Sequence, residues 1–443
     1  MLSDYKNGRR SSRRRFAVTA GILGLLLALV AGCSGGDDGG EQTAGSSTPV
    51  AEENPDGGPT EEVETGTEDT AVVSPAGFDI DAVLAADPNC ASPVTGEPLR
   101  IGYAADLGEI GGAADRPGSQ AAEHMARLVN CAGGLAGRPV EVVVADVSGS
   151  PIDTRAATLG LLDQDVHVLL GPPLPDPGFR VLLAAGGDVA VIFTGATEPA
   201  LADASALSFL VAFTDTQQST VAAQFALTNG WRKAATFSSP GPYFGYNPLV
   251  FREAFAANGG EVVGDFNMIP LEDEDFADEV AAMAGNPPDV IFGPFFANQI
   301  IALRAELDAA GIQAEIIATD AFEAGAGYTF AGTDGVFHVT HSFAAEGSRV
   351  EALVTSMTAA NGVPPEAASF AALAGDAFVV VADAYLRVQT TDPLTLGQAI
   401  ADAQAVAGIT GDLSYDGEGY PQKPIYVHEV VDGQPSLAAT IGG

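Results

Sequence analysis

The chain has 443 residues, 47% of them hydrophobic, and this length predicts two or three domains instead of one compact core. Its 58 acidic and 19 basic residues give a formal charge of -39, which repels phosphate backbones and excludes nucleic acid as a partner. Only three cysteines are present, too few for a disulfide-rich scaffold or a cysteine-based zinc site.

The N-terminal segment has the features of an export signal. Five arginines between residues 9 and 15 precede an apolar run, Phe16–Val30, which is too short for a comfortable transmembrane helix and suits a signal peptide. The run ends in Val30-Ala31-Gly32-Cys33, which resembles the lipobox of bacterial lipoproteins. We therefore expect residues 1–33 to be a lipoprotein signal ending at the lipidated Cys33, on the extracytoplasmic face of the cell membrane. A plain membrane anchor is the alternative, and the arginines leave general and twin-arginine export both open.

Residues 34–75 have the composition of a tether. They contain eleven Asp and Glu residues and no Lys or Arg, so they are predicted to be disordered and extended by like charge. Residues 76–98 form an N-terminal extension of the folded part. With Cys33 lipidated, Cys90 and Cys131 remain, and an even pair in an exported protein predicts one disulfide; two buried free thiols are the alternative.

Alternating apolar strands and helical segments fill the body of the chain. The expected elements of the first half are Leu99–Ala105, Gln120–Asn130 (helix), Val140–Ala145, Thr154–Leu162 (helix), Val166–Leu170, Phe179–Ala185 (helix), Val189–Phe193 and Leu207–Phe213. The pattern restarts with Thr216–Asn229 (helix), Ala234–Ser238, Pro248–Asn258 (helix), Glu261–Phe266, Phe276–Ala284 (helix), Asp289–Phe292, Gln299–Ala310 (helix) and Glu315–Ala318. Two successive units of this kind predict an α/β fold with two doubly wound parallel sheets.

The last quarter of the chain has a different order of elements. A strand at Gly335–Val339 precedes two long helices, Val350–Ala360 and Phe370–Val388. Leu413–Tyr415 and Ile425–Val430 are predicted to form a hairpin around Asp416-Gly417, because this dipeptide favours tight turns.

The sequence contains no recognisable catalytic, metal or cofactor motif. Phosphate-binding loops and the nucleophile elbow are missing, so a secreted hydrolase is a remote alternative and no cofactor is expected. His338 and His341 are three apart, which on a strand places them on opposite faces, so we expect them to be satisfied or exposed and not to share a metal. Asp412, Asp416 and Glu418 lack calcium-loop spacing and are interpreted as a solvated turn.

The informative residues follow the predicted parallel strands, because ligands of open α/β sheets bind beyond the carboxyl ends of the strands. The loops after the strands contain the candidates Leu174, Asp176, Gly195, Ala196, Thr197, Tyr243, Phe244, Phe295, Phe296 and Asp320. Together they suit a small polar molecule with an apolar part. Each also has a structural interpretation: the prolines beside Leu174 as loop stiffeners, the Phe pair as core, and Asp320 as a helix N-cap.

The order of these motifs resembles the type I periplasmic solute-binding proteins, in the branch that serves branched-chain amino acid ABC importers. The resemblance runs from about Leu99 to Leu437. Its segments are Asn130-Cys131-Ala132-Gly133-Gly134-Leu135-Ala136-Gly137, Leu169-Leu170-Gly171-Pro172, Thr194-Gly195-Ala196-Thr197-Glu198-Pro199-Ala200-Leu201, Phe244-Gly245-Tyr246-Asn247, Gly411-Asp412-Leu413-Ser414-Tyr415-Asp416 and Val431-Asp432-Gly433.

The resemblance implies a two-lobed clamp with hinge crossovers near Phe213, residues 335–340 and residues 410–415. Lobe one would contain residues 99–213 and 338–410, and lobe two residues 214–337 and 411–443. Loops at Leu174–Asp176 and Gly195–Thr197 would hold a ligand carboxylate, and Asp320 a ligand ammonium. Tyr243 or Phe244, and Phe295 or Phe296, would close over the ligand side chain, and Asp215 would lie at the first hinge.

The resemblance also implies a function: a lipid-anchored binding protein, not an enzyme, that delivers an amino acid or a related amide or organic acid to an ABC permease. A ligand-sensing receptor for a membrane signalling partner is the alternative. Three differences from the usual pattern of this family argue against ordinary leucine or valine as the ligand. The loop 172–177 lacks a hydroxyl and is rich in proline, Asp320 replaces a longer Glu, and the loop 107–115 contains no aromatic residue.

Overall fold

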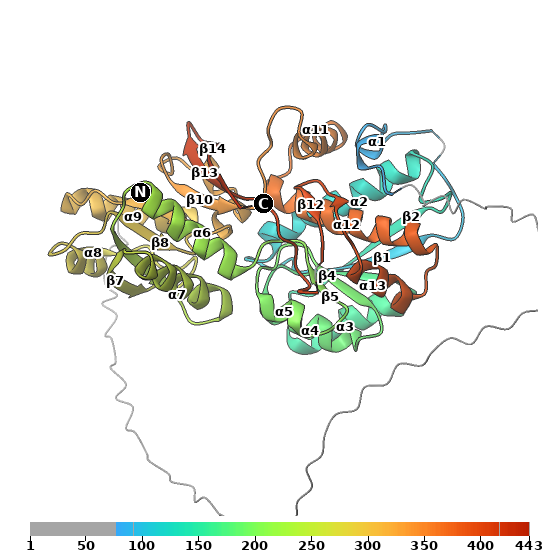
Figure 1. The fold of residues 1–443 in the computed structure, drawn as a ribbon, viewed down its shortest axis with the longest axis horizontal. Coiled ribbons are helices and arrows are strands. Elements are labelled where there is room, and N and C mark those ends of the chain that lie inside the picture. The colour runs from blue at the N-terminus through green and yellow to red at the C-terminus, as the bar shows by residue number, and fades with distance from the viewer. Residues whose placement is uncertain (1–76, 92, 416, 443) are drawn as a thin grey trace, which may run out of the picture. The chain divides into compact units, whose positions relative to one another are not determined.

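The computed structural model describes residues 77–91, 93–415 and 417–442 (Figure 1). The predicted signal, Cys33 and the predicted tether lie outside the described residues. The described residues form two large sheets and one two-stranded ribbon.

The first sheet has five strands, all paired in parallel, in the order β2-β1-β3-β4-β5. The strands are β1 (Leu99–Ala105), β2 (Val140–Asp146), β3 (Val168–Gly171), β4 (Ala190–Phe193) and β5 (Ser208–Leu210). The helices packed with this sheet are α1 (Ile80–Leu84), α2 (Gly112–Cys131), α3 (Pro151–Leu162), α4 (Pro175–Ala185), α5 (Pro199–Asp203), α11 (Arg349–Asn361), α12 (Ala368–Val388) and α13 (Pro393–Ala401).

Side chains of the first sheet alternate between two cores, as the two-residue period of a strand requires. Val168 and Leu170 of β3 face α2, α11, α12 and α13, whereas Leu169 faces α3, α4 and α5. β4 repeats the pattern, with Ile192 on the first face and Phe193 on the second. Because both faces are covered, these strands are apolar at every position, which explains why they were recognisable in the sequence.

The second sheet has seven strands in the order β14-β13-β10-β9-β8-β6-β7. The strands are β6 (Lys233–Ser238), β7 (Glu261–Asn267), β8 (Val290–Gly293), β9 (Glu315–Ala318), β10 (Phe337–Thr340), β13 (Ile425–Val431) and β14 (Gln434–Ile441). Helices α6 (Asp215–Thr228) and α7 (Pro242–Ala257) pack on one face, and α8 (Ala277–Met283) and α9 (Ala297–Ala310) on the other. The short α10 (Ala321–Ala324) follows β9, and a 3₁₀ turn occupies Gly327–Thr329.

These two sheets confirm the predicted α/β fold with doubly wound parallel sheets. The chain passes between the sheets three times: between β5 and α6, between β10 and α11, and between β12 (Asp412–Leu413) and β13. β10 belongs to the second sheet as far as Thr340, so the second passage starts a few residues beyond the expected boundary at 337/338.

The predicted hairpin around Asp416-Gly417 is wrong. Leu413 pairs with Val406 of β11 (Val406–Ala407), and β13 pairs with β14 and β10 instead. The turn of the real hairpin contains Asp432-Gly433, with both residues at positive φ, the conformation that such a turn requires. The C-terminal part of the sequence, from residue 411 on, therefore contains two Asp-Gly signals, and the second one forms the turn between β13 and β14.

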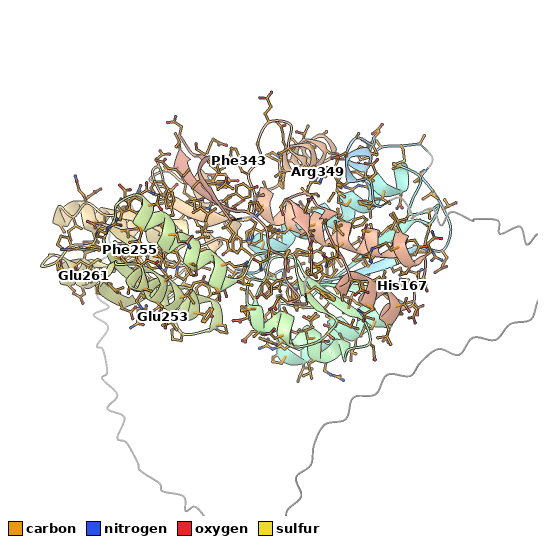
Figure 2. The ribbon with its side chains drawn as sticks, viewed as in Figure 1. His167, Glu253, Phe255, Glu261, Phe343 and Arg349 are labelled. Atoms are coloured by element: carbon orange, nitrogen blue, oxygen red, sulfur yellow. A yellow bond between two sulfur atoms is a disulfide. The ribbon has the colours of Figure 1, made fainter. Side chains whose placement is uncertain are left out.

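The N-terminal extension packs against the first sheet's helices. The guanidinium group of Arg349 donates to both carboxylate oxygens of Asp81 at 2.7 and 2.8 Å and to the carbonyl of Gly408 at 2.9 Å. Arg349 lies at the start of α11 (Figure 2). The side chain of Arg349 therefore links α1, the start of α11 and the segment between β11 and β12.

Among the described residues, one helix is long and apolar enough to cross a membrane. This helix is α12, and 94% of its apolar window is buried inside the protein. It packs along α2 and supplies a large part of the first core, so its apolar character follows from its position.

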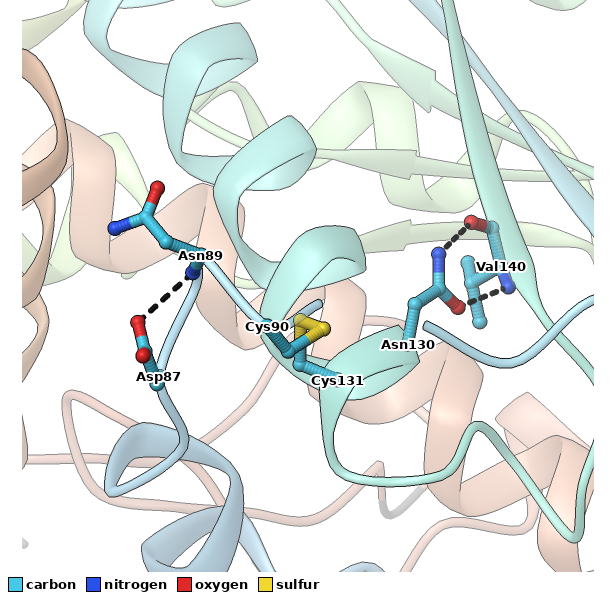
Figure 3. The surroundings of a disulfide bond; sticks show 6 residues. All are labelled: Asp87, Asn89, Cys90, Asn130, Cys131 and Val140. Atoms are coloured by element: carbon cyan, nitrogen blue, oxygen red, sulfur yellow. Dashed lines mark hydrogen bonds between the residues drawn. A yellow bond between two sulfur atoms is a disulfide. The ribbon is translucent and has the colours of Figure 1, made fainter. Parts of the chain in front are cut away.

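The predicted disulfide between Cys90 and Cys131 is confirmed (Figure 3). Their Cα atoms are 5.6 Å apart, which is the ordinary spacing of a disulfide. Next to it, the side-chain amide of Asn130 makes two 2.8 Å hydrogen bonds with the backbone of Val140, so the end of α2 is fixed to the start of β2.

Removal of this disulfide is expected to lower the free energy of unfolding by about 3–4 kcal/mol on the loop-entropy model. The bond closes a loop across 41 positions, and without it the unfolded chain gains conformational freedom. Urea unfolding of the Cys90→Ser/Cys131→Ser protein, compared with wild type with and without reductant, measures the effect. Equal stabilities of the oxidised and reduced wild type would contradict it.

Candidate functional site

A cavity lies where loops after strands of both sheets meet. The first sheet contributes Ile110 after β1, Pro173 and Leu174 after β3, and Gly195 and Thr197 after β4, together with Phe370 of α12. The second sheet contributes Tyr243 and Phe244 of α7, Phe296 after β8, Asp320 after β9, and α10. The lining is therefore mostly aromatic and aliphatic, with a carboxylate, a phenol and a threonine as its main polar side chains.

Seven of the eleven predicted ligand-binding residues line this cavity: Leu174, Gly195, Thr197, Tyr243, Phe244, Phe296 and Asp320. They come from five segments that are far apart in sequence, four loops and the first turn of α7, and that meet at the carboxyl ends of parallel strands. The place of the cavity therefore agrees with the rule that ligands of open α/β sheets bind beyond the carboxyl ends of the strands.

Three of the predicted ligand-binding residues, Asp176, Ala196 and Phe295, do not line the cavity. The Asp176 carboxylate is exposed and lies 3.7 Å from Arg180, one turn further along α4. Ala196 is fully buried in the core between β4 and α5. Phe295 is also fully buried and packs on Phe237, which confirms the structural interpretation for this member of the Phe pair.

Asp215, the fourth residue outside the lining, is buried at the start of α6. Its Oδ1 atom accepts hydrogen bonds from Thr197 at 2.7 Å, Asn247 at 2.9 Å and Gln218 at 3.0 Å. Burial raises the pKa of Asp215 to about 7, against the opposing effect of the hydrogen bonds from Thr197 and Asn247. Asp215 therefore orients the side chain of Thr197, which lines the cavity, but is not itself part of the lining.

Asp320 is 3% exposed and is held by the side chains of Tyr243 and His341. The Tyr243 hydroxyl donates to Oδ1, and Nε2 of His341 lies 3.0 Å from Oδ2. Burial, followed by the charge of Asp320, raises the pKa of Tyr243 well above its ordinary value, so this phenol keeps its proton. Asp320 precedes α10, but its side chain makes no capping hydrogen bond to the described residues of that helix, so the alternative role as N-cap is not supported.

His341 is a site residue that the sequence interpretation missed. Its ring stacks on Phe213 at a centroid distance of 3.8 Å and meets Phe370 edge-on at 5.6 Å. It follows β10 directly, so the same strand-end rule would have selected it. Phe370 was missed because it lies at the start of a helix.

His338 does not fit the expectation that it is satisfied or exposed, and this expectation was wrong. The ring is fully buried, and neither nitrogen has a hydrogen-bond partner among the described residues. The cause is its position inside β10, where it faces His428 of β13.

Within the described part of the chain, no Lys, Arg or His side chain is among the residues that line the cavity. A ligand anion would depend on backbone N–H groups and on Thr197. The first turn of α4 is a poor anion site, because Pro175 and Pro177 have no N–H to donate. The electrostatics of the cavity therefore favour a positive or hydrogen-bond-donating group near Asp320.

Two doubly wound sheets joined by three chain passages, with a cavity at their facing strand ends, define the type I periplasmic binding protein fold. The model of the periplasmic binding protein family matches residues 98–435, and the chain belongs to this family. Members of this family are binding proteins, in agreement with the expectation that the chain is not an enzyme.

Solved structures of similar fold include binding proteins for different ligands. The leucine-binding protein LivK of Thermotoga maritima is 21% identical, with a TM-score of 0.67 over 78% of this chain and 99% of that chain. LivJ of Streptococcus pneumoniae in complex with isoleucine is 20% identical, with a TM-score of 0.68 over 78% and 99%. A solute-binding protein of R. palustris in complex with benzoate is 20% identical, with a TM-score of 0.66 over 78% and 96%. Comparison with curated proteins gives no significant match.

Proposed function

We propose that this protein is a lipid-anchored extracytoplasmic solute-binding protein that captures an amino acid or a related amide and delivers it to an ABC importer. The observation that carries the proposal is a buried carboxylate, Asp320, among aromatic side chains at the junction of two lobes. Membership of the periplasmic binding protein family supports capture, and the transport roles named for structures of similar fold support delivery.

The lining favours one ligand class over another. A carboxylate in a cavity whose described lining has no cationic side chain attracts an ammonium or amide N–H group and repels an organic anion. Tyr243, Phe244, Phe296 and Phe370 offer the surface for an apolar part. A benzoate-like acid, as bound by one structure of similar fold, therefore fits less well than an amine or amide with a small apolar group.

The cavity has a volume of about 40 Å³, room for one or two water molecules. An amino acid needs several times this space, so the cleft must open before it binds. The three chain passages between the sheets are the natural hinges for this movement.

A thermal-shift screen of amino acids, their amides and small carboxylates tests the proposal. A ligand that binds only the native state raises the melting temperature, by an amount that grows with the logarithm of its concentration. We expect hits among compounds with a positive or amide nitrogen and a small apolar group. Hits confined to carboxylic acids without such a nitrogen would contradict the ligand class, and uptake of a labelled hit in cells lacking the gene distinguishes import from sensing.

Replacement of Cys33 by serine is expected to move the protein from the membrane fraction to the soluble fraction or to leave the precursor unprocessed. The prediction depends on the coincidence of the arginine-rich start, the short apolar run and the Val30-Ala31-Gly32-Cys33 box. Intact-mass measurement of the wild-type N-terminus provides the direct readout. An unmodified residue 33 in the mature protein would refute the anchor.

A further inference from the structure

Three metal-ligating side chains converge in the second sheet, apart from the solute cavity. His338 of β10 and His428 of β13 are direct partners in the antiparallel register, and their rings meet edge-on at a centroid distance of 5.3 Å. Glu323 belongs to α10, and its carboxylate approaches the same point. One ligand atom from each of the three residues lies within 4.8 Å of the other two.

All three side chains are buried: His338 is 0%, His428 3% and Glu323 5% exposed. None of the four ring nitrogens of the two histidines has a hydrogen-bond partner among the described residues. A buried polar group without a partner costs about 1–3 kcal/mol, so native proteins nearly always satisfy such groups. Two adjacent unpartnered imidazoles therefore indicate a missing partner that both can reach.

Imidazole nitrogens are the commonest metal ligands in proteins. A metal ion that both rings can reach is therefore a partner that would satisfy one nitrogen of each ring.

The carboxylate of Glu323 is held in position by two donors. The backbone N–H of Ser369 donates to Oε1 at 3.1 Å, and the hydroxyl of Thr340 donates to Oε2. Each carboxylate oxygen keeps a second lone pair for another contact. Such outer hydrogen bonds orient ligating carboxylates in known metal sites.

An aromatic ring lies beside each of the two histidines. Phe322 lies 5.1 Å from the ring of His338, and Phe343 lies 5.4 Å from the ring of His428, both as centroid distances. Figure 2 shows Phe343 in the segment that follows β10. The histidines therefore lie against apolar rings, and the burial of all three side chains keeps bulk water from competing for an ion that they can reach.

From these observations we propose that Glu323, His338 and His428 bind one divalent transition-metal ion, with Zn²⁺ as the best match. Two imidazole nitrogens and one carboxylate oxygen suit Zn²⁺, whereas Ca²⁺ and Mg²⁺ prefer oxygen ligands alone. A water molecule would complete a tetrahedral shell. The ion would tie α10 to β10 and β13, and α10 carries Ala321 and Ala324, which line the solute cavity.

The site is tested on the purified full chain after treatment with a chelator. Titration with Co²⁺ followed by visible absorption is expected to show one saturable equivalent with the ligand-field bands of a nitrogen- and oxygen-ligated ion. X-ray absorption of the Zn²⁺-loaded protein is expected to show two imidazole ligands. No saturable binding, or a first shell without imidazole, would overturn the proposal, and the latter would assign the ion to acidic surface groups.

Variants then identify the ligands. His338→Gln, His428→Gln and Glu323→Gln are each expected to weaken Zn²⁺ binding roughly 100-fold or more. His124→Gln is the matched control, because His124 is also buried but hydrogen-bonds to Ser356 at 2.8 Å in the first lobe. Wild-type affinity in all three variants, or an equal loss in the control, would refute the assignment. Measurements on the wild type are independent of how well the variants fold.

Discussion

Replacement of Asp320 by asparagine is expected to weaken binding of the captured ligand by roughly 30-fold to several-thousand-fold, which corresponds to about 2–5 kcal/mol. The carboxylate is the one acidic group among the described residues that line the cavity. Aromatic neighbours exclude water from it, so its attraction for a ligand ammonium is only weakly screened. The variant would leave the ligand cation buried opposite a neutral amide, which is the main origin of the loss.

The same substitution has a smaller effect on stability, and the two effects can be separated. The asparagine side chain would still accept from one of the present donors, Tyr243 or His341, but would lack the charge that favours both contacts. A loss of about 1–3 kcal/mol in the free energy of unfolding is expected. Titration calorimetry gives the affinity, and urea unfolding gives the stability.

Asp176→Asn is the matched control for Asp320. Asp176 follows a strand of the first sheet and was also predicted to be a ligand-binding residue, in the loop expected to hold a ligand carboxylate, but its exposed side chain lies outside the cavity. The control should bind the ligand as the wild type does. Equal affinities of all three proteins would refute the role of Asp320, and so would a ligand that carries no positive or N–H group.

The position of the cavity could be predicted from the sequence. Buried parallel strands are recognisable as apolar runs, and ligands of such sheets bind beyond the carboxyl ends of the strands. The rule does not state which side chain of a loop turns toward the cavity. Phe295 and Phe296 are adjacent and identical in type, yet one packs on Phe237 and the other lines the cavity. That choice depends on backbone torsions between β8 and α9, which a single sequence does not reveal.

The histidine cluster was beyond sequence reasoning for a different reason. His338 and His428 are ninety positions apart, and only the antiparallel pairing of β10 with β13 brings them together. The sequence placed β13 in a hairpin around the wrong Asp-Gly turn, so this pairing could not be anticipated. Local turn signals are reliable for the existence of a turn, but they do not state which strands it joins.

A second large effect is expected in the pH dependence of stability, and it originates at Asp215. Its carboxyl group is fully buried, and Oδ2 has no hydrogen-bond partner among the described residues. Burial raises its pKa from 3.8 to about 7, and the charges of Asp320 and Glu198 act in the same direction. The folded protein therefore holds a proton on Asp215 under conditions in which the unfolded chain has lost it.

This difference fixes the sign of the effect. Between pH 3.8 and about pH 7 the folded state binds more protons at this position than the unfolded state does, so the contribution of Asp215 to stability falls as the pH rises. Below this range both states are protonated, and above it both are ionised, so the contribution is constant. The full change is on the order of 4 kcal/mol, from about three pKa units at 1.36 kcal/mol each.

Asp215→Asn isolates this contribution, because asparagine does not titrate and its carbonyl can accept from Thr197, Asn247 and Gln218 as Oδ1 does now. Its amide nitrogen would take the place of Oδ2, which in the folded wild type near pH 4 is itself a buried O–H donor without an acceptor among the described residues, so the two proteins should have similar stabilities there. Relative to wild type, the variant should therefore gain on the order of 4 kcal/mol between pH 4 and pH 8. Urea unfolding of both proteins across this range measures the difference, in which the effects of all other carboxylates cancel. A difference that is constant with pH, or that changes in the opposite direction, would show that Asp215 is ionised throughout and that its three donors outweigh its burial.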